Sequence, residues 1–278
     1  MSALPSAITL SGIFIYPVKS LGGISLPAAN LTPLGLQHDR RWLIVDERNR
    51  FLTQREHAEM ALLAVEPAYN GFLLRHRQRP ELLPLYVPFE ATPERTLFVT
   101  IWDDMVFAWR GAPEADEWLS EALGQTCKLV YMSDMVRREV DPDKPELNPT
   151  GTLVSFADGY PYLLASEESL AELNARLAEP VPMNRFRPNL VVRGLDTADA
   201  EMQWANFQIG GHAFRSVRGC GRCVVTTIDQ ATAQKNSTSE PLRTLATYRK
   251  QGNKIMFGQN VTGPASGQLR VGDAVVLG

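Results

Sequence analysis

The stretch Gly-Cys-Gly-Arg-Cys-Val-Val-Thr-Thr-Ile-Asp, residues 219–229, contains two of the three cysteines of the chain, Cys220 and Cys223. The β-branched run at 224–228 predicts a strand directly after the second thiol. The glycines on either side of Cys220 permit unusual backbone angles and a close approach of a ligand. Arg222 precedes the second thiol, and positive charge beside a thiol lowers its pKa. The stretch therefore predicts a rigidly held thiolate, which is a nucleophile or a soft metal ligand.

Several interpretations of this cysteine pair remain open. A redox-active disulfide is one, although the thioredoxin pattern places such a pair before a helix and a strand is expected here. A zinc site normally needs a second ligand pair, whereas Cys127 is alone and the four histidines are scattered. In another interpretation, the two cysteines are small buried residues without any reactivity. The last is one thiolate bound to a metal whose other ligands come from a cofactor.

Length and composition narrow the class of protein. The chain has 278 residues, enough for one large domain or two ordinary ones, and 44% of them are apolar. The net charge of -3 gives no bias toward nucleic acid or a membrane surface. Three cysteines are too few for a disulfide framework, no apolar run has the length of a membrane span, and the N-terminus shows no signal or transit peptide. We expect a cytoplasmic protein that binds neither nucleic acid nor membranes.

The first half of the chain is dominated by short strand-like segments. This spacing of short alternating segments, with prolines and turns between them, predicts a sheet or barrel. The predicted strands are residues 7–18, 24–34, 42–46, 51–55, 71–75, 82–87 and 95–102. Residues 113–123 show helical spacing of apolar side chains and predict a helix.

The second half begins after a polar, proline-rich segment at 133–151, which predicts a linker or an active-site loop. We place the domain boundary there, giving domains 1–135 and 136–278. Ser166 is expected to cap a helix that stops before Pro180. Further expected elements are strands at 190–192, 204–209 and 212–217, a helix at 241–250 and a pair of strands within 268–278.

Basic residues stand at the ends of several predicted strands. They are Lys19, Arg40, Arg187 and Arg222. Arginine suits a phosphate or carboxylate through its planar fork, and lysine acts as a point charge. Pro188 favours an extended backbone at Arg187. Each basic residue alone is more often a solvated surface charge, and the sequence has no glycine-rich loop of the Walker or dinucleotide type.

Six motifs, taken together and in order, resemble the MOSC superfamily, and within it the amidoxime-reducing proteins of mitochondria and their bacterial relatives. Each motif is weak alone, but the ordered set covers nearly the whole chain. The motifs are Tyr16-Pro17-Val18-Lys19-Ser20, Asp39-Arg40-Arg41-Trp42, Phe186-Arg187-Pro188-Asn189, Cys220-Gly221-Arg222-Cys223 with Thr226-Thr227-Ile228-Asp229, Phe257-Gly258-Gln259-Asn260 and Val271-Gly272-Asp273.

This resemblance implies an α+β, β-rich fold, with an N-terminal β-barrel-like MOSC_N domain followed by a MOSC β-barrel domain with a few helices. It also implies a molybdenum–molybdopterin cofactor between the domains, with Cys223 as the molybdenum ligand and Cys220 not a ligand. Gly221 and Gln230 depart from residues common among relatives. The positions that match the family's pterin and phosphate contacts are Lys19, Ser20, Arg40, Arg187, Asn189 and Arg222.

The function implied by the resemblance is reduction of N-hydroxylated compounds such as amidoximes and hydroxylamines. Asp229 is a candidate catalytic acid, although a structural role for this carboxylate is at least as plausible. Three cysteines cannot ligate a plant-type iron–sulfur cluster. Electrons are therefore expected from a separate ferredoxin-like or cytochrome b5-like protein and its reductase. The alternative from another class is a carrier that holds cofactor or sulfur on Cys223 for delivery.

Overall fold

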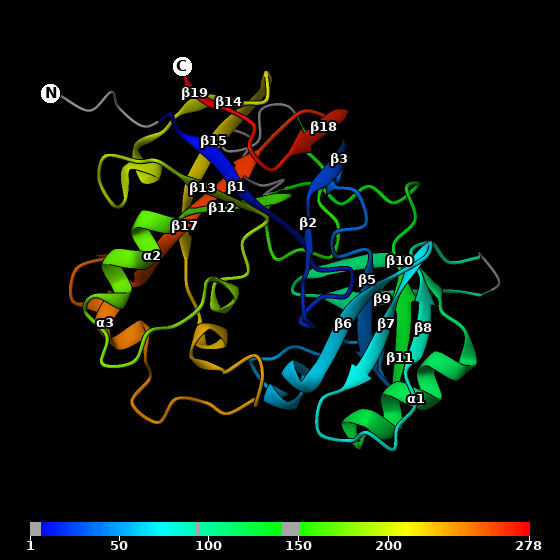
Figure 1. Cartoon of the computed structure of the whole chain (residues 1–278). Coiled ribbons are helices and arrows are strands. Elements are labelled where there is room, and N and C mark those ends of the chain that lie inside the picture. Colours follow the sequence, from blue (N-terminus) through cyan, green and yellow to red (C-terminus); the bar gives the residue numbers. More distant parts are fainter. Residues whose placement is uncertain (1–6, 93–94, 141–150) are drawn as a thin grey trace, which may run out of the picture.

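A computed structural model describes residues 7–92, 95–140 and 151–278. In these residues, most of the regular secondary structure is short strands in four sheets, and three α-helices accompany them (Figure 1). The expected β-rich α+β class is confirmed. Within the described ranges, no helix is long and apolar enough to cross a membrane.

The largest sheet has nine strands and combines the two ends of the chain. Its order is β19-β14-β15-β17-β12-β13-β1-β2, with β16 beside β17, and only the β12–β13 pair is parallel. The sheet does not close into a continuous barrel, but a bridge between Thr9 and Ala274 links β1 to the residue before β19. The strands are β1 (Thr9–Ile15), β2 (Ile24–Leu26), β12 (Tyr162–Ser166), β13 (Leu190–Arg193), β14 (Asn206–Ile209), β15 (His212–Gly221), β16 (Lys250–Gln251), β17 (Lys254–Thr262) and β19 (Val275–Leu277).

Three smaller sheets complete the β structure. In Figure 1 the strands between residues 63 and 131, drawn in cyan and green, form a group at the right. One sheet has the order β5 (Trp42–Asp46), β11 (Cys127–Tyr131), β10 (Asp104–Arg110) and β9 (Thr96–Ile101). The other two are β6 (Leu63–Ala68), β7 (Gly71–His76), β8 (Leu85–Pro88), and β18 (Gly267–Arg270), β3 (Ala28–Thr32), β4 (Gly35–Leu36).

Two predicted helices begin where the local signals place them, although the second ends at Asn174, earlier than the predicted end before Pro180. Helix α1 (Pro113–Leu123) has proline in its first turn, buries Trp118 and Leu119, and ends at Gly124 with φ of 65°. A left-handed glycine after the last turn is a common helix terminator. Helix α2 (Glu167–Asn174) begins after Ser166, whose hydroxyl accepts a 3.0 Å hydrogen bond from the Ser169 amide. The predicted N-cap is therefore confirmed.

Other predicted elements differ from the structure. Helix α3 (Leu242–Ala246) is shorter than predicted because the chain enters β16 at Lys250. The predicted strand at 24–34 is two short strands, β2 and β3, interrupted at Pro27 and followed by a turn, as expected where proline cannot donate to a ladder. Residues 51–55 contribute only the bridge from Phe51 to Val45. The last two strands pair with β3 and β14 instead of each other.

The predicted linker or active-site loop at 133–151 lies largely outside the described residues. The boundary between 1–135 and 136–278 stays a prediction. The N-terminal strands β1 and β3 pair with β13 and β18 of the C-terminal half. The two halves of the chain are therefore joined by backbone hydrogen bonds as well as by side-chain packing.

One hydrophobic cluster runs through both halves and fixes the central strands. It includes Ile13 of β1, Trp42 of β5 and Leu164 of β12, which are fully or almost fully buried. Strand β12 lies between β13 and β17, and Leu163, the neighbour of Leu164 on this strand, lines the cleft described below. The packing of Leu164 therefore stabilises the strand from which this lining residue projects.

We expect Leu164→Ala to lower the free energy of unfolding by about 2–5 kcal/mol, because it leaves a cavity in a buried layer. Leu83→Ala is the control, since the Leu83 side chain is 77% exposed and its loss should cost little. Urea unfolding of the two variants measures the difference. Equal losses of stability would show that β12 is not part of a tightly packed core.

Candidate cofactor-binding site

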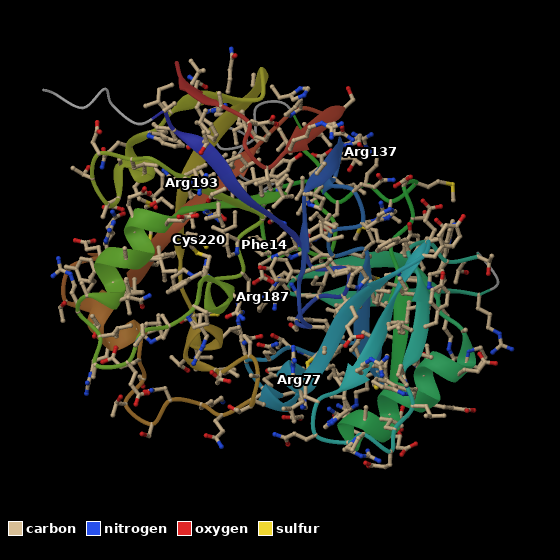
Figure 2. All side chains as sticks on the ribbon, in the orientation of Figure 1. Phe14, Arg77, Arg137, Arg187, Arg193 and Cys220 are labelled. Atoms are coloured by element: carbon tan, nitrogen blue, oxygen red, sulfur yellow. The ribbon has the colours of Figure 1, made fainter. Side chains whose placement is uncertain are left out.

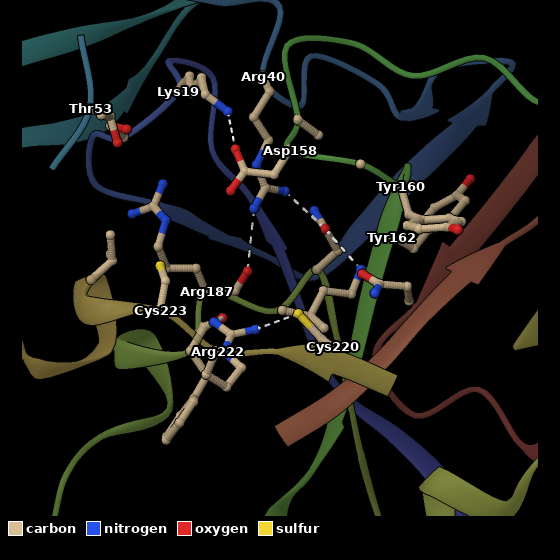
Figure 3. A pocket seen from close by; sticks show the side chains of 18 of the residues that line it. Lys19, Arg40, Thr53, Asp158, Tyr160, Tyr162, Arg187, Cys220, Arg222 and Cys223 are labelled. Carbon is tan, nitrogen blue, oxygen red and sulfur yellow. Dashed lines mark hydrogen bonds and ion pairs between the residues drawn. The ribbon is translucent and has the colours of Figure 1, made fainter. Parts of the chain in front are cut away.

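A cleft of about 780 Å³, counted with its open mouth, lies where the nine-stranded sheet meets the turns of the N-terminal half. Arg187 and Cys220, two of its lining residues, lie near the middle of the molecule in Figure 2. Figure 3 shows their side chains together with those of other lining residues. The charged and sulfur-containing residues that line the cleft are Lys19, Arg40, Arg55, Asp158, Arg187, Cys220, Arg222 and Cys223.

The cysteine stretch enters the cleft from the end of β15. The Arg222 amide donates a 2.7 Å hydrogen bond to the Ile255 carbonyl, and Cys223 follows it at the start of a 3-10 helix, Val224–Thr227. The strand predicted at 224–228 was wrong. The hydroxyls of Thr226 and Thr227 donate to carbonyls three residues back, at 3.0 and 2.7 Å. Such local side-chain bonds compete with strand formation.

The two thiols of this stretch line the same cleft but have different neighbours. All three cysteines of the chain are free. The Arg222 guanidinium donates to the Cys220 sulfur at 2.9 Å, so the arginine contacts the first thiol and not the second (Figure 3). In the described part of the chain, no group of three His, Cys, Asp or Glu side chains is arranged to hold a metal. A metal at Cys223 would take its other ligands from a cofactor.

Lys19 is a buried cation at the edge of the cleft. Its ammonium group donates to the Phe156 carbonyl at 2.9 Å and pairs with the Asp158 carboxylate. The rings of Phe51 and Trp102 lie 5.7 Å from the same nitrogen. Burial lowers the pKa of Lys19, and Asp158 opposes that effect. The lysine is 5% exposed and is held in one position by these groups.

Arg40 connects the N-terminal turn to the strand entry at Asn189. Its guanidinium donates to Asp39 at 2.6 Å, to the Asn189 side-chain oxygen at 2.9 Å and to the Arg187 carbonyl at 3.3 Å. The Asn189 amide group donates in turn to the Phe14 carbonyl at 3.1 Å. Asn189 is 1% exposed and its side chain holds Arg40, whereas its predicted cofactor contact stays a prediction.

Arg187 is held in a strained backbone conformation. Its φ is 54°, in the left-handed region, so the extended backbone that we predicted from Pro188 was wrong. Its guanidinium donates to the Leu21 carbonyl at 2.6 Å, and it lies 4.3 Å from the ring of Tyr16, as does that of Arg40. Together these contacts hold Arg187 in the strained backbone conformation. Burial lowers the pKa of Arg187 to about 10.

The remaining predicted contacts, Ser20 and Arg222, also line the cleft. Ser20 has φ of 67°, and its carbonyl accepts a 2.5 Å hydrogen bond from Gln54. Arg222 donates to the Phe186 carbonyl at 2.7 Å. Its Nε is buried and has no hydrogen-bond partner among the described residues. A buried donor without a partner is costly, and a polar ligand atom would satisfy it.

Asp229 lies apart from the other predicted site residues, because it does not line the cleft. One carboxylate oxygen accepts from the amides of Ala231 and Thr232, both at 2.9 Å, and the other pairs with Arg185 at 3.0 Å. Burial alone would raise the pKa of Asp229, but these hydrogen bonds and Arg185 lower it. The geometry favours a role in fixing the loop, and the predicted catalytic role stays untested.

Three residues of the site were not predicted as functional. Tyr16 supports two guanidinium groups, and burial raises its pKa to about 12, which keeps it neutral. Tyr16 belongs to a motif that carried the resemblance, so a signal for it existed. Asp158 and Arg55 had none, because neither residue belongs to one of the six motifs that carried the resemblance.

The donor set of the cleft fits an anionic group that carries a soft metal. Five cationic side chains and one carboxylate line it, so it presents an excess of positive charge. Arginine and lysine are the usual partners of phosphate, and a thiol is a soft metal ligand. The unpaired Nε of Arg222 adds a donor that a ligand could engage.

Comparisons with known proteins agree with this chemistry. The MOSC N-terminal beta barrel domain matches residues 7–126, and the MOSC domain matches residues 152–276. Mitochondrial amidoxime-reducing component 1 of Xenopus laevis is 30% identical over 96% of this chain and 81% of its own length. The protein of the same name from Homo sapiens is 30% identical, with 97% and 82% covered. Molybdenum cofactor sulfurase of Oryza sativa subsp. japonica is 32% identical over 91% of this chain, which spans only 32% of that relative.

We expect Ellman's reagent to titrate two thiols in the native protein at pH 8 and a third only after unfolding. Cys220 and Cys223 are partly exposed, whereas Cys127 is 1% exposed and burial raises its pKa to about 11. Thiolate is the reactive form. The Cys127→Ala variant should keep both fast thiols. Three thiols reacting at one rate in native wild-type protein would contradict this arrangement.

Proposed function

The chain belongs to the MOSC family, and from that premise we propose that it is a molybdenum-cofactor-dependent reductase of N-hydroxylated compounds such as amidoximes and hydroxylamines. The observation that carries the proposal is a cleft in which, among the described residues, the Cys223 thiol shares the walls with five cationic side chains. The relatives named amidoxime-reducing component match over four fifths of their own length, which supports a reductase.

The proposed cofactor contacts are the residues that converge in the cleft. Cys223 is the proposed ligand of the molybdenum, and the cationic side chains are the proposed partners of the pterin phosphate. The buried amide of Asn189 and the turn at Ser20 are proposed to orient the pterin. The set is Lys19, Ser20, Arg40, Arg187, Asn189, Arg222 and Cys223.

When bound, the cofactor supplies the redox chemistry that converts an N–OH group to N–H and water. That conversion consumes two electrons and two protons. Asp229 is held ionised outside the cleft lining, so we assign it to loop positioning and take both protons from solvent at the open mouth. The chain binds and orients the reactants, as proteins generally do for cofactor chemistry.

A separate protein is the proposed source of electrons. The chain has three cysteines and no dinucleotide fingerprint, so it lacks the ligands of a plant-type cluster and a recognisable nicotinamide site. A ferredoxin-like or cytochrome b5-like carrier, reduced by its own reductase, meets this need.

A carrier of cofactor or sulfur is the second candidate. It is favoured by the match to molybdenum cofactor sulfurase and by a second thiol, Cys220, in the same cleft at 2.9 Å from Arg222. A carrier would hold molybdenum without oxidising a reduced dye when a hydroxylamine is added. The reductase would do both.

Cys223→Ala should lose at least about nine tenths of its molybdenum, because even an outer-shell partner of a metal is worth roughly 10–100-fold in affinity. Cys220→Ala is the matched control and should keep most of the metal. Both proteins are made in a host that synthesises the cofactor, and metal is measured per folded protein. Equal losses in the two variants would count against Cys223 as the ligand.

Purified, molybdenum-loaded protein should reduce benzamidoxime with reduced viologen and with NADH plus a reductase–carrier pair, but not with NADH alone. Turnover with the carrier should fall as ionic strength rises, because weak electron-transfer encounters are steered by charge. Turnover with NADH alone would reveal a nicotinamide site in the chain. Inactivity with every donor at full molybdenum occupancy would favour the carrier function.

A further inference from the structure

Among the described residues, the cleft lining contains one carboxylate, that of Asp158, and it contacts two of the cations. Asp158 pairs through one oxygen with the Lys19 ammonium group, and its other oxygen accepts from Arg55 at 3.3 Å. Figure 3 shows the Asp158 carboxylate directed at Lys19, with the guanidinium group of Arg40 beside it. The carboxylate therefore lies at the point where positive charge converges, which is also where a ligand phosphate would find the most donors.

The two cations are anchored independently of Asp158. Lys19 also donates to the Phe156 carbonyl, and its ammonium lies 5.7 Å from the ring of Trp102. The Arg55 guanidinium lies 4.2 Å from that same ring. Contacts between cations and aromatic faces are attractive. Loss of the carboxylate would thus leave both cations in place and facing the cleft.

Asp158, in contrast, lies at the surface. Its side chain is 61% exposed, whereas that of Lys19 is 6% exposed. It belongs to a loop of bends, and the next residue is Gly159, around which a Cβ would meet no atom within 4 Å. The carboxylate can therefore turn outward into solvent at little steric cost.

A buried cation without a counterion destabilises the folded protein, because its charge has been removed from water without compensation. Asp158 can therefore leave Lys19 at least cost when another anion takes its place. We propose that Asp158 is an exchangeable counterion, which competes with an anionic ligand group of the phosphate class for Lys19 and Arg55. The identity of that ligand as the pterin phosphate rests on the proposed function, whereas the exchange itself rests on these contacts.

Titration of inorganic pyrophosphate into cofactor-free, full-length protein tests the exchange by calorimetry and by thermal unfolding. Asp158→Asn keeps the shape of the side chain and removes the competing charge. We expect it to bind pyrophosphate about tenfold more tightly than wild type, a difference of about 1.4 kcal/mol. The control is Asp134→Asn, which removes an equal charge that pairs with Arg41 at 2.8 Å on an 86% exposed side chain. It should leave the affinity unchanged.

Without added anion, Asp158→Asn should unfold at a lower temperature than wild type, because Lys19 has lost its counterion. Saturating pyrophosphate should restore the unfolding temperature. Arg55→Gln should weaken pyrophosphate binding severalfold in either background. Equal or weaker binding by Asp158→Asn, or no effect of Arg55→Gln, would overturn the proposal. These measurements use neither molybdenum nor turnover, so their failure is distinct from failure of the proposed reductase.

Discussion

Concentrated positive charge in one cleft is the constraint on which the rest of the structure depends. Four cations are held by backbone carbonyls as well as by side chains, and three of those hydrogen bonds join residues 137 to 166 positions apart in the sequence. The bonds that aim the cations into the cleft therefore also tie the N-terminal turns to the C-terminal half. The same hydrogen bonds thus fix the positions of the cations and hold the two halves of the chain together. The cations are Lys19, Arg40, Arg187 and Arg222.

Much of the fold and of the cleft could be predicted from the sequence. Helix α1 and the Ser166 cap follow from local signals that tertiary packing does not oppose. The convergence of basic residues followed from their positions at strand ends and from ordered motifs. Prediction failed where long-range or side-chain contacts decide the backbone. Thr226 and Thr227 turn a β-branched run into a 3-10 helix, and distant partners hold Arg187 at a positive φ.

The contact between Arg222 and Cys220 changes which thiol of the cysteine stretch has a cationic partner. Adjacency in sequence placed the arginine beside Cys223, but the strand geometry directs it to the other thiol. Cys223 is thereby left beside the cations without a charged partner of its own among the described contacts, and it is available to a metal. Asp158 and Arg55 escaped prediction for a related reason, because only the folded chain brings them to Lys19.

The direct test is anomalous diffraction at the molybdenum edge from crystals of cofactor-loaded protein. Our account predicts one molybdenum peak in the cleft beside the Cys223 sulfur, with the phosphate among the cationic side chains. A molybdenum peak at Cys220, or one outside the cleft with Cys223 free, would contradict it.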